Sequence, residues 1–148
     1  RGANPRLPPC PAAGRSFPPA TPAAACYPQL SRTLGALADA GARVVVTSGN
    51  HDSAARLGFQ SALLRSEISV VTDPLSVGVP VTVYDEHGPV HVYGIPYLEP
   101  AIVRHAWEGV ELRSQAQTMQ HALDLVRADL AERGGRSVVA AHCFAAAG

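Results

Sequence analysis

One stretch of the sequence constrains the fold more than any other, because an apolar run leads directly into a polar loop. The run Arg-Val-Val-Val-Thr-Ser at 43–48 is followed by Gly-Asn-His-Asp at 49–52. A run that is apolar at nearly every position is typical of a parallel strand covered on both faces. In open α/β sheets, ligands bind beyond the carboxyl ends of the strands, so the loop at 49–52 is placed for chemistry.

Each residue of this loop can have a chemical role. Gly49 allows a turn where a Cβ would be crowded, and Asn50 can offer a side-chain oxygen to a cation. His51 can release a proton near neutral pH, and Asp52 can orient His51 or cap the helix that follows. Ordinary turns use the same residue types, so a plain turn with an N-cap is the alternative interpretation.

The rest of the chain alternates helical and extended patterns, which predicts an α/β fold. In the first half, we expect a helix at 30–41, a strand at 43–48, a helix at 53–65 and a strand at 68–71. In the second half, β-rich runs at 79–84 and 89–95 are separated by Asp-Glu-His-Gly, which predicts an antiparallel hairpin in a mixed sheet. The remaining expected elements are a short helix within 97–107, a helix at 113–133 and a strand at 137–142.

The long helix at 113–133 carries an apolar stripe that we expect to face the core. Its members recur at alternating spacings of three and four residues: Ala116, Met119, Leu123, Val126 and Leu130. Gly134 and Gly135 are expected to end this helix.

Composition places the chain among globular proteins. It has 148 residues, of which 47% are hydrophobic and 16% charged. No apolar run approaches the roughly 18 residues that cross a bilayer, so we expect no membrane partner. The three cysteines are an odd number without metal-type spacing, which favours a reducing compartment and a cytoplasmic location. The net charge of zero gives no support of its own for a nucleic-acid partner.

Three separated segments carry a family resemblance. Gly-Asn-His-Asp at 49–52 is similar to the third signature of the calcineurin-like metallophosphoesterases, and the longer string from Gly49 to Phe59 resembles their SbcD branch. Val-Tyr-Gly-Ile-Pro-Tyr-Leu-Glu-Pro at 92–100 is similar to a second segment of that branch. Val-Val-Ala-Ala-His at 138–142 resembles the strand that carries a metal-binding histidine. SbcD proteins are the nuclease subunits of bacterial SbcCD DNA-repair complexes.

The resemblance implies a fold, an activity and partners for residues 29–148. The fold would be part of a four-layer sandwich with mixed sheets between helices. The activity would be metal-dependent cleavage of DNA, as exonuclease and endonuclease, with an SbcC-type ATPase subunit as partner. Double-stranded DNA ends or hairpins would be the substrates, and the complete protein could form a homodimer. Two ions, usually Mn²⁺ with Mg²⁺ as the alternative, would activate water and stabilise the departing oxygen.

The same resemblance implies roles for four residues. Asn50 and His142 would be metal ligands, which suits the preference of such ions for oxygen and imidazole donors. His51 would act at the scissile phosphate as a general acid or as electrostatic support, and Asp52 would orient His51.

The sequence also departs from the family pattern at its start. Residues 1–28 hold eight of the thirteen prolines and no acidic residue, which predicts an extended or disordered segment. The family has Asp-x-His and Gly-Asp-x-x-Asp motifs here, and neither occurs in this segment. A proline-rich recognition tail and a plain disordered tail are two interpretations. We favour a third, that the segment is foreign to the fold through out-of-frame translation or a misjoined gene model.

These departures affect the expected activity. A dinuclear site needs about seven or eight protein ligands, and we identify two; a closing Gly-His-x-His motif is also missing. We therefore expect weak metal binding and little activity from this chain. Two alternatives remain: a small-molecule phosphodiesterase or phosphatase of the same superfamily, and a catalytically dead fragment.

Overall fold

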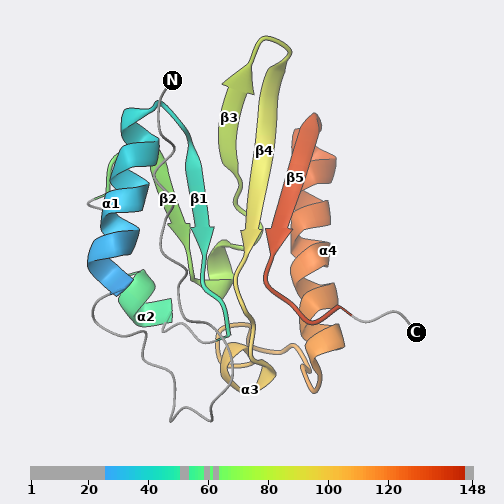
Figure 1. The fold of residues 1–148 in the computed structure, drawn as a ribbon. Coiled ribbons are helices and arrows are strands. Elements are labelled where there is room, and N and C mark those ends of the chain that lie inside the picture. The colour runs from blue at the N-terminus through green and yellow to red at the C-terminus, as the bar shows by residue number, and fades with distance from the viewer. Residues whose placement is uncertain (1–25, 51–53, 59–60, 62–63, 146–148) are drawn as a thin grey trace.

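The chain folds into helices and strands that follow the expected order (Figure 1). The computed structural model describes residues 26–50, 54–58, 61 and 64–145. The elements are α1 (Cys26–Asp39), β1 (Val44–Thr47), α2 (Ala54–Leu57), β2 (Ile68–Val71), the 3-10 helix η2 (Pro74–Ser76), β3 (Val81–Asp85), β4 (Gly88–Ile95), α3 (Pro100–Val103), α4 (Gln115–Arg133) and β5 (Arg136–Ala141). The predicted α/β class is confirmed.

The strands form two sheets. β1 and β2 pair in parallel, from Val44 opposite Ile68 to Thr47 opposite Val71. In the second sheet, β4 lies between β3 and β5, antiparallel to β3 and parallel to β5. The predicted hairpin and the mixed sheet are confirmed. β5 forms an edge, and all six of its residues are exposed.

Local signals explain where the long helices begin and end. Gly41, at a φ of 79°, follows α1, and Gly134, at a φ of 66°, follows α4. These positive φ values suit glycine, which has no Cβ to clash. Ser114 caps the start of α4, because its side chain accepts a hydrogen bond from the Gln117 N–H at 3.2 Å.

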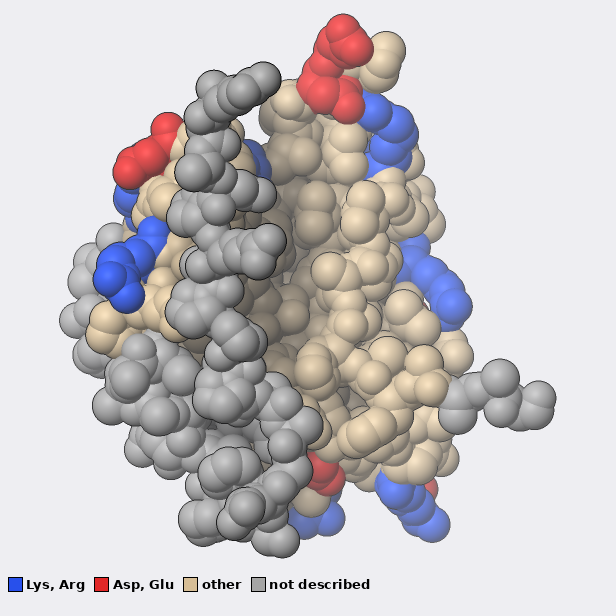
Figure 2. All heavy atoms as spheres, viewed as in Figure 1, with Lys and Arg blue, Asp and Glu red and all other residues tan. Residues whose placement is uncertain are grey.

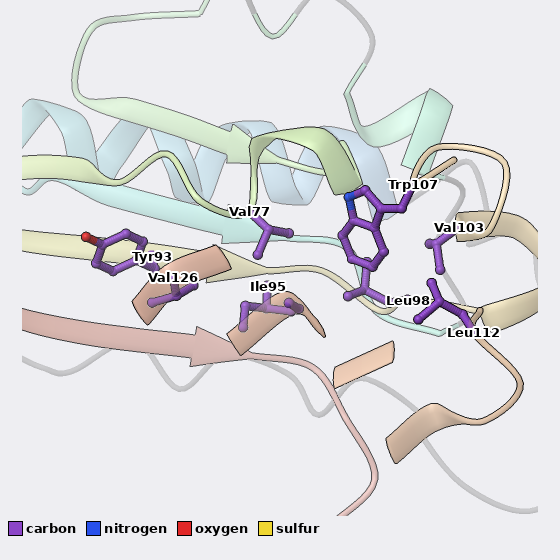
Figure 3. Packing of buried hydrophobic residues seen from close by; sticks show 9 residues of the cluster. Val77, Tyr93, Ile95, Leu98, Val103, Trp107, Leu112 and Val126 are labelled. Atoms are coloured by element: carbon purple, nitrogen blue, oxygen red, sulfur yellow. The ribbon is translucent and has the colours of Figure 1, made fainter. Parts of the chain in front are cut away.

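The core lies between the mixed sheet and α4 (Figure 3). Tyr93 and Ile95 of β4 are fully buried against Ala122 and Val126 of α4. Trp107 joins this cluster from the segment between α3 and α4. The core therefore fixes β4, whose carboxyl end leads into the site described below.

Three expectations about helices need correction. The helix expected at 53–65 is α-helical only over Ala54–Leu57, and the residues at 59–60 and 62–63 lie outside the described part of the chain. Gly58, the residue after this helix, lies close to the end of β2: a Cβ on Gly58 would be 2.6 Å from Thr72 Oγ1.

α1 begins at Cys26, so residues 26–28 belong to a helix and not to a disordered segment. Pro28 is tolerated because it lies in the first turn, where a helix leaves the backbone N–H groups without partners. Residues 1–25 lie outside the described part of the chain, so the interpretations of that segment stay predictions.

On α4, the residues that are buried are Thr118, Ala122 and Val126. Val126 of the predicted stripe is therefore confirmed as a core residue, and Met119, Leu123 and Leu130 pack against the core; Ala116 is exposed, so its predicted place in the core-facing stripe is wrong. Among the described residues, no helix is long and apolar enough to cross a membrane.

Candidate functional site

The candidate site lies where β1, β4 and β5 end, at the lower end of the molecule in Figure 1. Two backbone hydrogen bonds join these strand ends. The N–H of Tyr97 donates to the carbonyl of Ser48 at 2.8 Å, and the N–H of His142 donates to the carbonyl of Ile95 at 3.0 Å. The segment 95–97 is thus bonded to the chain on both sides, and it brings the residues after β1 next to the residues after β5.

Asn50 and His142 meet at this point. Nε2 of His142 lies 3.2 Å from Oδ1 of Asn50, although the two residues are 92 positions apart in the sequence. Because an amide oxygen only accepts, the imidazole Nε2–H is the donor in this hydrogen bond. Both side chains are exposed, so an ion or a phosphate can reach them.

Tyr97 supports His142 from the side. The two rings meet edge to face, with their centroids 6.0 Å apart. The Tyr97 hydroxyl donates to Glu99 Oε2 at 3.1 Å and accepts from Gln115 Nε2 at 3.0 Å. Desolvation and the hydrogen bond to Glu99 raise the pKa of the Tyr97 phenol, so the phenol stays a neutral donor.

A cavity of about 450 Å³ adjoins Asn50. Ser48, Thr72 and Glu99 contribute polar groups to its wall, and Tyr97 and Val103 contribute apolar surface. A few polar groups in a mainly apolar wall are typical of small-ligand sites. Asn50 therefore lies at the edge of a space large enough for part of a substrate.

Sequence reasoning singled out neither Tyr97 nor Glu99 as a site residue. Both follow β4 directly, as the 49–52 loop follows β1, and the rule about carboxyl ends of strands could have found them. The two catalytic candidates, His51 and Asp52, lie outside the described residues. Their roles stay predictions.

The donor atoms suit a manganese or magnesium ion in type. An amide oxygen and an imidazole nitrogen are both accepted by Mn²⁺. Two neighbouring ligands of one octahedral ion, each bound at about 2.1 Å, lie about 3 Å apart, close to the 3.2 Å between Asn50 Oδ1 and His142 Nε2. The part of the chain that the structure describes contains no group of three or more His, Cys, Asp or Glu residues arranged for a metal ion.

Comparisons with known proteins add no assignment. No protein-family model matches the sequence. A search of curated proteins found no significant match either.

Proposed function

We propose that this chain carries part of the active site of a metal-dependent phosphodiester hydrolase that acts on DNA, of the calcineurin-like, SbcD type. One observation carries the proposal: the hydrogen bond that joins Asn50 to His142 across 92 positions of sequence. These are the two residues to which the family resemblance gives a metal-binding role. An SbcC-type ATPase partner and a cytoplasmic location belong to the same proposal. The odd number of cysteines supports the location alone, because it favours a reducing compartment.

Asn50 would hold an ion through Oδ1 and His142 through Nε2. When bound, such an ion polarises the phosphate and lowers the pKa of the attacking water. To serve as a ligand, His142 must carry its ring proton on Nδ1 and give up the hydrogen bond to Asn50. The edge-to-face contact with Tyr97 restricts the imidazole while this change occurs.

We expect this chain to bind Mn²⁺ weakly. Two neutral donors contribute little against the cost of dehydrating a dication, and the bridging carboxylate of the family pattern is not identified in the sequence. Hydrolysis of DNA by the purified chain should accordingly be slow.

A Mn²⁺ titration followed by NMR tests the proposal. Because Mn²⁺ is paramagnetic, it should broaden the ring signals of His142 and the side-chain amide signals of Asn50 at lower concentrations than those of other residues. His87 is the internal control, because it is an exposed histidine in the turn between β3 and β4. Asn50→Ala and His142→Ala should each weaken binding by about tenfold or more, and His87→Ala should leave it unchanged. Equal broadening of His87 and His142 would contradict the site.

An assay with two substrates tests the reaction class. Mn²⁺-dependent cleavage of linear duplex DNA that is lost in His142→Ala would support a nuclease. Hydrolysis of bis(p-nitrophenyl) phosphate without cleavage of DNA would instead favour a small-molecule phosphodiesterase.

A further inference from the structure

A second cavity lies on the other side of Tyr97, with a volume of about 590 Å³. Its wall comes from α3, from the start of α4 and from the segment after β5, which lie at the same end of the molecule (Figure 1). The side chains that matter for its chemistry are Arg104, Arg113, Tyr97, Phe144, Gln115 and Glu99. Because Tyr97 and Glu99 line both cavities, this cavity is a neighbour of the one that adjoins Asn50.

Two guanidinium groups in this wall are available to an anion. Within the described part of the chain, the Arg104 side chain has no hydrogen-bond or ion-pair partner. Arg113 contacts Glu111 at 3.0 Å, but these side chains are 76% and 81% exposed, so water screens the pair and it can open. Figure 2 shows basic and acidic side chains together at this lower end of the molecule.

The wall also contains one acidic group, Glu99, whose carboxylate is engaged in a hydrogen-bond chain. The Glu99 carboxylate accepts a hydrogen bond from the Tyr97 hydroxyl, which in turn accepts one from Gln115. The start of α4 lies in the same wall, and the positive end of a helix dipole favours an anion there.

The wall also offers an aromatic face. Phe144 is 73% exposed, and its ring meets Tyr97 edge to face with centroids 6.2 Å apart. The contact with Tyr97 thus restrains the Phe144 ring, while much of this ring stays open to solvent. Such a ring can stack on an unpaired base.

We propose that this cavity binds a segment of single-stranded nucleic acid beside the Asn50 and His142 pair. Arg104 and Arg113 contact the phosphates, and a base stacks on Phe144. The volume of about 590 Å³ exceeds what a free phosphate needs and suits a nucleotide. The combination of guanidinium groups with an aromatic platform is typical of proteins that bind single strands. The inference rests on the proposed function, because it identifies where the substrate strand would lie.

The test measures binding of fluorescein-labelled (dT)12 to the full chain by anisotropy, in EDTA, so that no metal contributes. Arg104→Gln, Arg113→Gln and Phe144→Ala should each weaken binding by about tenfold. Each arginine substitution should also reduce the salt dependence by about 0.7 in the slope of log K against log salt. Arg113→Lys keeps the charge but loses the planar fork, so its affinity should lie between those of Arg113→Gln and the wild type.

Matched controls come from the same chain. Arg127→Gln changes an exposed arginine that lies within α4 and, like Arg113, pairs with an acid, and Tyr84→Ala removes another exposed aromatic ring. Both should bind (dT)12 within about twofold of the wild type. If Arg113→Gln and Phe144→Ala bind no more weakly than these controls, the inference is wrong.

The two proposals fail in different ways. Asn50→Ala should lose Mn²⁺ binding but keep its affinity for (dT)12 in EDTA, and Arg113→Gln should do the reverse. Unaltered (dT)12 binding by Arg113→Gln would contradict the strand-binding cavity and would not affect the proposed metal site. Unaltered Mn²⁺ binding by Asn50→Ala would contradict the proposed metal site and would not affect the strand-binding cavity.

Discussion

At the scale of single residues, Asp129 joins β4 to α4 by holding two side chains at once. Its Oδ2 accepts from the buried Tyr93 hydroxyl at 2.6 Å, and its two oxygens accept from Arg133 at 2.8 and 2.7 Å. The Arg133 and Tyr93 hydrogen bonds lower the pKa of Asp129 from 3.8 to about 2. Burial, with a further contribution from Asp129, raises the pKa of Tyr93.

This shift predicts a dependence of stability on pH. Because the pKa is lowered in the folded state, the contribution is complete above 3.8 and is lost as the pH falls toward about 2. Asp129→Asn should therefore lose less free energy of unfolding than the wild type between about pH 5 and about pH 3. Urea unfolding at the two pH values measures this, with Asp124→Asn on the exposed side of the same helix as the control. If the free energy of unfolding falls by the same amount in the Asp129→Asn variant and in the wild type between the two pH values, this prediction is wrong.

At the scale of elements, α4 shows how sequence periodicity can find a helix and most of the residues that pack against the core, but not the most deeply buried ones. The apolar stripe predicted the helix within two residues of its observed start. The stripe could not show that the small residues Thr118 and Ala122 lie deepest, because the space available is set by Tyr93 and Ile95 of β4. Small side chains let α4 approach the sheet closely, and the larger apolar residues then flank the contact.

Substitutions of two alanines on α4 test which of them, Ala122 or Ala116, faces the core. Ala122→Leu should destabilise the protein by about 1–3 kcal/mol, because the fully buried site has no room for the added atoms. Ala116→Leu, six positions earlier on the exposed side, should change stability by less than about 0.5 kcal/mol. Chemical denaturation of the two variants checks this. A larger loss of stability in Ala116→Leu than in Ala122→Leu would show that Ala116, as the stripe predicted, faces the core.

The short elements were harder to predict than the long ones. The composition of 53–65 predicts a helix, but among the described residues of this stretch only Ala54–Leu57 is α-helical. Gly58, which follows these residues, lies close to Thr72, and no local pattern reveals this approach to a residue fourteen positions away. Strand boundaries, by contrast, were predicted closely, because β-branched runs and turn residues are local signals.

At the scale of the whole molecule, the two sheets meet closely at a glycine. A Cβ on Gly94 of β4 would lie 3.0 Å from Thr47 Cγ2 and 3.1 Å from Val71 Cβ, at the ends of β1 and β2. This contact lets the Ser48 carbonyl reach the Tyr97 N–H. The absence of a side chain at Gly94 therefore sets the distance between the two halves of the site.

Gly94→Val should push the sheets apart. We expect a loss of about 1–3 kcal/mol in the free energy of unfolding, because valine adds a Cβ that would already crowd Thr47 and Val71, and two methyl groups beyond it. Gly35→Ala is the control: with nothing within 4 Å of its Cβ and a helical position, it should stabilise the protein by roughly 0.5–1 kcal/mol. Thermal or urea unfolding measures both. A Gly94→Val variant as stable as the wild type would show that the sheets separate freely.

The site was predictable only in part. Asn50 and His142 each follow a strand that the sequence reveals, so their presence at one end of the fold could be expected. Their 3.2 Å contact could not, because it depends on how two separate sheets pack. The cavity with Arg104 and Arg113 was missed because its wall combines three segments that are distant in sequence.

The backbone bonds of segment 95–97 have a consequence for motion. The Ile95 carbonyl accepts from the His142 N–H, and the Tyr97 N–H donates to the carbonyl of Ser48, two residues before Asn50. The chain at His142 and the chain just before Asn50 are therefore both bonded to one tripeptide, which has the rigid Pro96 at its centre. We expect this shared tripeptide to move Asn50 and His142 together whenever the two sheets shift relative to each other. The distance between the two side chains should therefore vary less than the distance between the sheets.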